Sequence, residues 1–203
     1  MAETRLTSLS VTGFRNYASC QLDIAASNVL LLGPNGAGKT NLLEAISMLA
    51  PGRGLRRARG EHLPYAAGGT RSWAVASCIS IADETYRIGT GVPADSDTGQ
   101  RIMRRDEETV SQSDIGRLFS ASWITPSMDG IFTDSPGTRR RFLDRQVIAF
   151  DAAHIGRTNR YEKMLRERNA LLAERRGDAA WFTAIEASLA AVAVAVTAAR
   201  HSL

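Results

Sequence analysis

Eight consecutive residues have the types and spacing of a phosphate-binding turn. They are Gly33, Pro34, Asn35, Gly36, Ala37, Gly38, Lys39 and Thr40. The glycines let several backbone N–H groups point into one concavity, where phosphate oxygens accept hydrogen bonds. In such a turn the lysine ammonium reaches the terminal phosphates, and the threonine hydroxyl coordinates Mg²⁺. The motif therefore predicts that the chain binds ATP with Mg²⁺.

The scarcity of lysine supports a special role for Lys39. Among the 25 lysine and arginine residues of the chain, only Lys39 and Lys163 are lysine. A compact ammonium on a flexible stem suits the phosphate loop, whereas a planar guanidinium does not. The alternative is a glycine-rich turn that binds nothing, and the isolated lysine disfavours it.

The loop needs a strand before it and a helix after it. Residues 28–32 form a continuous apolar run, which predicts a strand buried on both faces. After the loop, apolar residues recur at helical spacing until Pro51 and Gly52 end the pattern. Strand, loop and helix in this order are the context in which the motif binds phosphate.

The rest of the first 150 residues is a mixture of strands and helices. Strands are predicted within residues 6–11 and 21–24, at 73–81 and 85–88, and at 121–125. A short helix is predicted at residues 113–119, and loops at 53–69 and 93–100. The three tryptophans, Trp73, Trp123 and Trp181, have core-like positions and are predicted to be packing residues.

The last third changes character. Ser135 opens a helix, and from residue 151 to 203 two long helices are predicted, with a break at 175–178. The apolar run at 187–199 is shorter than the roughly 18 residues of a membrane span and predicts a buried helix. We therefore expect two domains, an ATPase lobe over 1–150 and a helical subdomain over 151–203.

Composition narrows the class of protein. The 203 residues are 44% hydrophobic and 23% charged, which is typical of a globular chain. The first residues carry no secretory signal, so a cytoplasmic location is expected. Cysteine and histidine lack ligand spacing, which predicts neither a zinc site nor a disulfide scaffold.

Basic residues occur in clusters, and the net charge of +4 supports a polyanionic partner only weakly. Arg53, Arg56 and Arg57 lie on a glycine-rich loop and suit contacts to DNA phosphates, with a solvated loop as the alternative. The run from Arg139 to Arg141 opens a helix. There, pairing with acidic neighbours such as Asp144 is favoured over contact with DNA or nucleotide.

Several segments resemble one known family. The residues Asn41-Leu42-Leu43-Glu44 after the loop are similar to the SMC and RecF branch of ABC-type ATPases. The cluster Phe14-Arg15-Asn16-Tyr17, the arginine-rich loop after Pro51, and the segment at 135–144 resemble RecF proteins in the same order. The fold implied is α/β: an ABC-type P-loop ATPase lobe, with a mixed sheet and a phosphate-loop helix, followed by an incomplete helical lid subdomain.

The resemblance also implies a function. RecF-type proteins are ATP-dependent, DNA-binding recombination mediators in DNA repair and replication. They recognise gapped or single-strand/double-strand junction DNA, load RecA and act in the SOS response. ATP drives a homodimer that clamps DNA, and the partners are DNA, a second copy and other mediator proteins, without a membrane. The same resemblance brings Arg15 close to the nucleotide, with a purely structural salt bridge as the alternative.

Two departures limit what can be carried over. Where ABC-type proteins have a metal-binding Gln, this chain reads Thr125-Pro126-Ser127-Met128-Asp129, so Asp129 is the candidate substitute. The signature loop and the acidic Walker B strand are absent from this sequence. The chain is therefore expected to supply half of a composite ATP site, with no catalytic residue assigned, and whether it hydrolyses ATP stays open.

Two other classes remain as alternatives. One is a structural or chromosome-associated ATPase of the SMC type, against which the short helices count. The other is an ABC-type ATPase coupled to a membrane partner, against which Asn41, the Arg15 cluster and the arginine-rich loop count.

Overall fold

The computed structural model describes residues 3–58, 60–173 and 179–203. By internal packing the chain forms two compact units, Met1–Ala121 and Ser122–Leu203. We describe each unit by itself. The division into an ATPase lobe and a helical subdomain after residue 150 stays a prediction.

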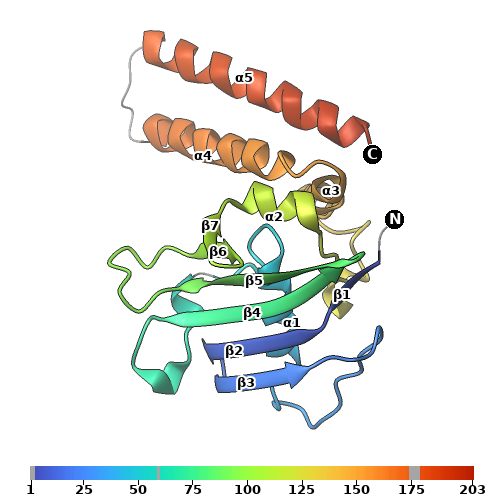
Figure 1. The fold of residues 1–203 in the computed structure, drawn as a ribbon. Helices are drawn as coiled ribbons and strands as arrows, with labels where there is room; N and C mark the ends of the chain where they lie inside the picture. The colour runs from blue at the N-terminus through green and yellow to red at the C-terminus, as the bar shows by residue number, and fades with distance from the viewer. Residues whose placement is uncertain (1–2, 59, 174–178) are drawn as a thin grey trace. The chain divides into compact units, whose positions relative to one another are not determined.

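The first unit is a seven-stranded sheet with one long helix (Figure 1). The strand order is β3-β2-β4-β5-β6-β7, with β1 also paired to β4, and each pairing is antiparallel. The strands are β1 (Thr4–Leu6), β2 (Ser8–Phe14), β3 (Tyr17–Asp23), β4 (Trp73–Ile81), β5 (Glu84–Val92), β6 (Ile102–Arg105) and β7 (Glu108–Val110). The described strands thus contain no parallel pair of the kind that a mixed sheet has.

The elements around the phosphate loop were largely predicted. The helix after the loop is confirmed as α1 (Lys39–Leu49), and the two predicted central strands are confirmed as β4 and β5. The strands β6 and β7 were not predicted, because four and three residues are too few to reveal a period of two.

Two predicted strands are wrong. Residues 28–32 form no strand, and the side chains of Val29, Leu30 and Leu32 are 58%, 78% and 82% exposed. Residues 121–125 form none either, and Ile124 is 87% exposed. An extended segment becomes a strand only when a neighbour accepts its hydrogen bonds, and none of the described strands pairs with either segment.

The core of the first unit lies between α1 and the sheet. One face of α1 buries Leu42, Ala45, Met48 and Leu49 against residues of β2, β4 and β5. Trp73 is 2% exposed, and its ring centroid lies 5.3 Å from that of Phe14, so its predicted packing role is confirmed. Apolar burial of this kind is the main force that holds α1 on the sheet.

The C-terminal end of α1 is fixed by a partly buried arginine. The guanidinium of Arg101 donates to the carbonyl oxygens of Met48 and Gly52 and to the Thr90 hydroxyl. Burial lowers the pKa of Arg101 to about 10. Since the last carbonyls of a helix lack partners within it, this side chain satisfies groups that would otherwise be unpaired.

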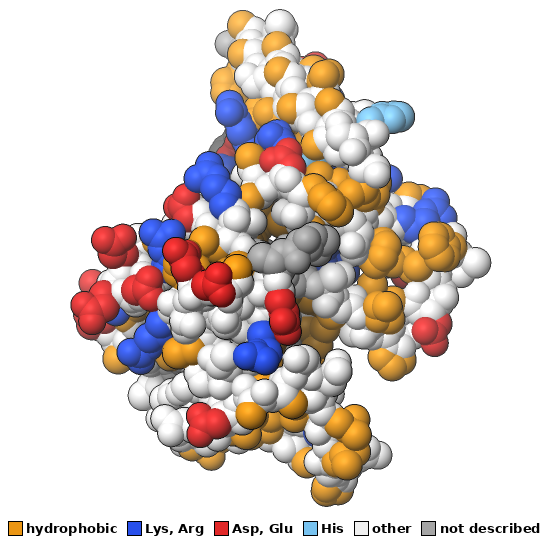
Figure 2. Space-filling model, turned by 45° about the vertical axis from the view of Figure 1, so that its right-hand side comes forward, with side chains coloured by type: hydrophobic (Ala, Val, Ile, Leu, Met, Phe, Trp, Pro, Cys, Tyr) orange, Lys and Arg blue, Asp and Glu red, His pale blue; other side chains and the backbone are white. Residues whose placement is uncertain are grey.

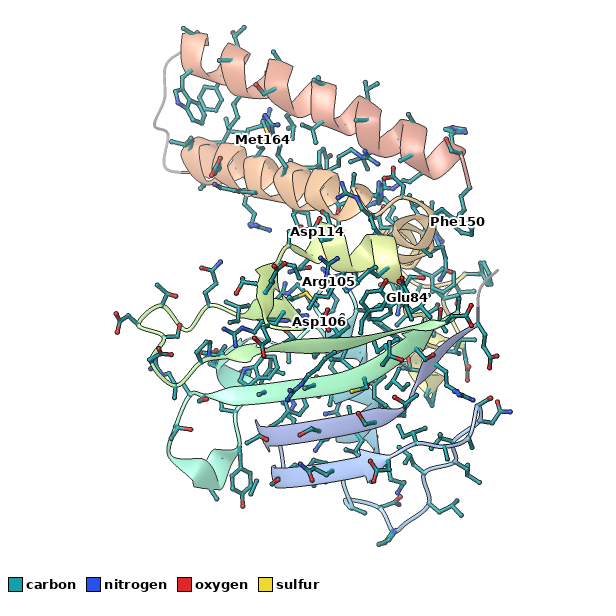
Figure 3. All side chains as sticks on the ribbon, viewed as in Figure 1. Glu84, Arg105, Asp106, Asp114, Phe150 and Met164 are labelled. Carbon is teal, nitrogen blue, oxygen red and sulfur yellow. The ribbon has the colours of Figure 1, made fainter. Side chains whose placement is uncertain are left out.

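Short elements complete the first unit. Two 3₁₀ turns, η1 (Gly60–His62) and η2 (Ala66–Gly68), lie in the loop before β4. The predicted short helix is confirmed as α2 (Gln112–Leu118), which begins with a capping box between Ser111 and Asp114. Figure 3 labels Asp114 on α2 and Asp106 in the turn between β6 and β7.

The described residues of the second unit form three helices and one 3₁₀ turn, η3 (Pro126–Met128). The helices are α3 (Pro136–Phe150), α4 (His154–Ala173) and α5 (Ala179–His201), and Ser135 caps α3 as predicted. The break predicted at 175–178 lies outside the described residues.

A carboxylate joins these three helices. Arg200 on α5 donates two hydrogen bonds to Asp144 on α3, at 2.7 and 2.8 Å, and His154 Nε2 on α4 lies 2.8 Å from Asp144 Oδ1. Burial by itself raises the pKa of Asp144, but the hydrogen bonds from Arg200 and His154 outweigh it, so the pKa is lowered.

The predicted burial of the last helix is wrong. Val196 is the buried residue of α5, whereas Trp181 and Val194 are 41% and 69% exposed. Figure 2 shows hydrophobic side chains distributed over this helix. By length and composition alone α5 is able to cross a membrane, with a mean hydropathy of 1.8 and 6% of its apolar window buried. Apolar composition predicted the helix, but burial depends on a neighbouring surface that the described residues do not supply.

Candidate phosphate-binding site

The glycine loop turns directly into α1. Gly38 is the N-cap residue of the helix and has φ 98°, a left-handed conformation that favours glycine. A Cβ at this position would lie 2.5 Å from Tyr17 Oη and 2.6 Å from Asn16 Nδ2. The backbone angle therefore favours glycine at position 38, and a larger residue would also displace the ends of the Tyr17 and Asn16 side chains.

The two side chains expected to act on phosphate lie on the first turn of α1. Lys39 Nζ donates to the carbonyl oxygens of Gly33 and Pro34, at 2.7 Å each, so its ammonium lies across the loop. Thr40 is exposed beside it. The first N–H groups of a helix and its dipole favour an anion, so this end of α1 is suited to phosphate.

The turn between β2 and β3 presents Arg15 and Asn16. Arg15 has φ 56°, a conformation that glycine usually takes in two-residue hairpins and that costs another residue about 1 kcal/mol. Two backbone hydrogen bonds hold the turn: Arg15 N donates to Leu63 O at 2.8 Å, and Tyr65 N donates to Gly13 O at 2.7 Å. The position of Arg15 is thus fixed by the backbone.

The side chain of Arg15 makes a bidentate ion pair with Glu44 on α1. Its Nε and Nη2 donate to the two carboxylate oxygens at 2.8 Å each, and its Nη1 donates to His62 O at 2.7 Å. The Glu44 side chain is 1% exposed and that of Arg15 is 18% exposed. Arg15 therefore has the structural ion pair that the sequence left open, and its contact with a nucleotide stays a prediction.

A second arginine reaches the same carboxylate from the arginine-rich loop. Arg56 Nη1 donates to Asn41 Oδ1 at 2.8 Å and to Glu44 Oε2 at 3.2 Å. Asn41 Nδ2 in turn donates to Asn16 Oδ1 at 2.7 Å. The structure thus brings Arg56 to the start of α1, whereas Arg53 and Arg57 are exposed on the same loop.

A hollow of about 440 Å³ opens beside Arg15. Its lining includes His62, Tyr65, Thr70 and Arg71, which together offer cationic, hydroxyl and aromatic surface. The lining also includes the acidic Glu61, so the hollow offers groups of both charges to a polar ligand.

Other candidate residues belong to the second unit. Asp129 follows η3, and its role as a metal ligand stays a prediction. Arg139 donates to Phe132 O and Arg141 to Thr138 Oγ1, while Asp144 pairs with Arg200 and His154, so the predicted pairing with Asp144 is wrong. Within the described ranges, no group of three or more His, Cys, Asp or Glu side chains could hold a metal ion.

Reasoning from the sequence missed the role of Glu44. The residue lies one helical turn before Met48, on the face of α1 that buries its apolar side chains. A carboxylate on a buried helix face requires a cationic partner, because an unpaired buried charge is strongly unfavourable. That requirement was the signal available in the sequence.

Comparison with known proteins gives consistent matches. The family model described as "RecF/RecN/SMC N terminal domain" matches residues 5–197. The "DNA replication and repair protein RecF" of Mesorhizobium japonicum is 44% identical over 207 residues, covering 100% of this chain and 53% of the relative. The protein of the same name from Brucella abortus is 43% identical over 194 residues, covering 95% and 50%. The chain spans about half the length of the curated relatives that it matches.

Two solved structures share the fold. A structure of "the recombination mediator protein RecF-ATPrS in RecFOR pathway" matches with a TM-score of 0.85 and 24% identity, covering 98% of this chain and 54% of the other. A second, of RecF-ATP in the same pathway, matches with a TM-score of 0.83 and 24% identity, covering 98% and 53%. At this identity the likeness concerns the fold alone, and it confirms the predicted α/β fold class.

Proposed function

We propose, from the premise that the chain belongs to the RecF/RecN/SMC N-terminal domain family, that its first unit binds the triphosphate of ATP with Mg²⁺. The family match confirms the resemblance to RecF-type proteins. The observation that carries the proposal is the loop at 33–40, which ends on a left-handed Gly38 and starts α1 with Lys39 lying across it. Two relatives with the same fold are named for their complexes with ATPrS and ATP.

Roles for individual residues follow from this proposal. The N–H groups of residues 33–40 and the ammonium of Lys39 hold the phosphates, while Thr40 coordinates Mg²⁺. Three of the five N–H groups of Arg15 donate to Glu44 and His62 O, which leaves two for the nucleotide among the described contacts. Asp129 stays a proposed Mg²⁺ ligand on the ground of its sequence position alone.

We propose further that the protein acts on DNA in repair and replication, as the names of its curated relatives suggest. Arg53, Arg56 and Arg57 are exposed on one loop and suit the phosphates of gapped or junction DNA. ATP binding would join two copies around the DNA. RecA loading, the SOS response, other mediator proteins as partners and a cytoplasmic location belong to the same proposal.

Two rival functions are less well supported. An SMC-type structural ATPase calls for long heptad helices, whereas α4 (His154–Ala173) has 20 residues. An ATPase coupled to a membrane gains some support from the composition of α5. Against it, Glu186 in the middle of α5 forms an ion pair with Arg168 of α4 at 2.6 Å, which is costly to bury in lipid.

Binding of fluorescent ATP to the Lys39→Ala variant tests the phosphate-loop proposal. We expect at least about a tenfold loss of affinity, because the variant removes the charge nearest the terminal phosphates. Lys163→Ala is the matched control, since Lys163 is exposed on α4. Equal ATP affinity in the Lys39→Ala variant and the control, with unchanged circular dichroism, would overturn the assignment.

A further inference from the structure

Two arginines share one buried carboxylate next to the phosphate loop. We propose that Glu44 is a positioning residue that holds the Arg56 side chain beside α1. A phosphate group that binds Arg56 then replaces Glu44 as its partner. The phosphate belongs either to the nucleotide or to nucleic acid. The proposal rests on the proposed function and adds a form of regulation to the same site.

The two arginines hold Glu44 unequally. Arg15 makes two hydrogen bonds of 2.8 Å to its oxygens, the short bidentate geometry of a strong ion pair. Arg56 offers a single nitrogen at 3.2 Å and divides it with Asn41. The side chain of Arg56 is 42% exposed, against 18% for Arg15. Arg15 is therefore the permanent partner, and Arg56 the replaceable one.

The charges of the cluster keep the free-energy cost of releasing Arg56 small. Two guanidinium groups face one carboxylate, so the cluster carries one surplus positive charge, and the exposed Arg56 is the group that carries it. When Arg56 leaves, Glu44 keeps both hydrogen bonds from Arg15 and no buried charge is left unpaired. A phosphate gives Arg56 an anion that it does not share with Arg15.

The cluster also contacts the start of the phosphate-loop helix. Asn41, which accepts from Arg56, follows Thr40 directly and donates to Asn16, one of the two residues packed against Gly38. Departure of Arg56 frees Asn41 Oδ1 at the first turn of α1. Asn41 therefore links phosphate binding at Arg56 to phosphate binding at the loop. Each of the two binding events should change the affinity of the other by the same factor.

A double-mutant cycle between Glu44→Gln and Arg56→Gln tests the proposal. The first measurement uses gapped DNA and the second uses fluorescent ATP, so that they distinguish the two sources of phosphate. In at least one of them, Arg56→Gln should weaken binding about fivefold to tenfold. In the same measurement, Glu44→Gln should tighten binding about threefold in the parent and leave it unchanged in the Arg56→Gln background.

Controls distinguish the effect of the Glu44–Arg56 contact from the effect of a change in net charge. Asp83→Asn removes an exposed carboxylate from the β4–β5 turn and should lack the dependence on Arg56. If the effect belongs to DNA, Arg56→Gln also lowers the slope of log K against log salt by about one, which a structural role would not do. An effect of Glu44→Gln that is the same with and without Arg56 overturns the proposal.

Glu44→Gln removes a buried charge, so a second variant covers the outcome that it fails to fold. Asn41→Ala removes the acceptor at 2.8 Å from Arg56 and leaves the Arg15 pair intact. This variant should bind the DNA or the ATP about twofold to threefold more tightly, again only when Arg56 is present. No tightening in this variant overturns the proposal. If Lys39→Ala leaves ATP binding unchanged, the proposed function fails separately from this inference.

Discussion

Each of the two units has a carboxylate held between two basic side chains, and the two clusters differ in exposure. In the first unit Glu44 is held by Arg15 and Arg56, whose side chains are 18% and 42% exposed. In the second unit Asp144 is held by His154, at 0%, and Arg200, at 24%. The second cluster joins three helices and has no replaceable member, whereas the first ends in a half-exposed arginine at the edge of the phosphate loop. The difference in exposure between Arg56 and Arg200 thus distinguishes an ion pair that a ligand can replace from one that only holds the fold together.

The largest expected effect comes from Arg15→Gln. The buried Glu44 would retain only the 3.2 Å contact with Arg56, so the free energy of unfolding of the first unit should fall by about 3 kcal/mol. Hydrogen exchange of the α1 amides in urea measures it. Arg5→Gln, on the exposed part of β1, is the control and should leave exchange unchanged. Equal exchange in the two variants would show that Arg15 is not the permanent partner.

Arg200→Gln should have the next largest effect. Asp144 loses two hydrogen bonds and keeps its contact with His154, so the second unit should lose about 2 kcal/mol of unfolding free energy. Hydrogen exchange of the α3 amides in urea measures this loss. Arg166→Gln, whose parent side chain is 71% exposed, serves as the control. A loss as small as that of the control would contradict the structural role of Asp144.

Acid should weaken the second unit by a smaller amount. The folded-state pKa of Asp144 is lowered, so its stabilising contribution is complete above its unfolded pKa of about 3.9 and is lost as pH falls through the folded value. Urea midpoints followed at α3 from pH 6 to pH 3 should therefore drop below about pH 4. Asp144→Asn should remove this part of the pH dependence. An identical pH profile in that variant would contradict the assignment.

The smallest expected effect is that of Arg56→Gln on stability. Because Arg15 still satisfies Glu44, the unfolding free energy should change by no more than about 0.5 kcal/mol. The same α1 amides provide the measurement. A loss approaching that of Arg15→Gln would erase the distinction between permanent and replaceable partners.

The sequence predicted local conformation better than it predicted burial. The phosphate loop, α1 and the β4–β5 pair follow from motif and periodicity, because their partners lie within the chain. The run at 28–32 and the helix α5 were predicted to be buried from apolar composition alone, and both are largely exposed. Apolar residues indicate a tendency to be buried, but only a neighbouring surface satisfies it.

The candidate site shows the same limit. The residues of the loop are contiguous, so a single motif identified them. Arg15, Glu44 and Arg56 are separated by 29 and 12 positions, and they meet because the β2–β3 turn, α1 and the loop after α1 lie together. Of these three residues, only Glu44 could have been expected from the sequence to have an ion-pair partner, because its charge lies on a buried helix face.

The exposed run at 28–32 also affects how the chain behaves in solution. Val29, Leu30 and Leu32 are exposed apolar side chains, and the run carries neither charge nor proline to oppose association between copies. Concentrated solutions should therefore become turbid over time, and a lysine in place of Leu30 should delay it. The segment that leads the chain into its phosphate loop is then also a liability for aggregation.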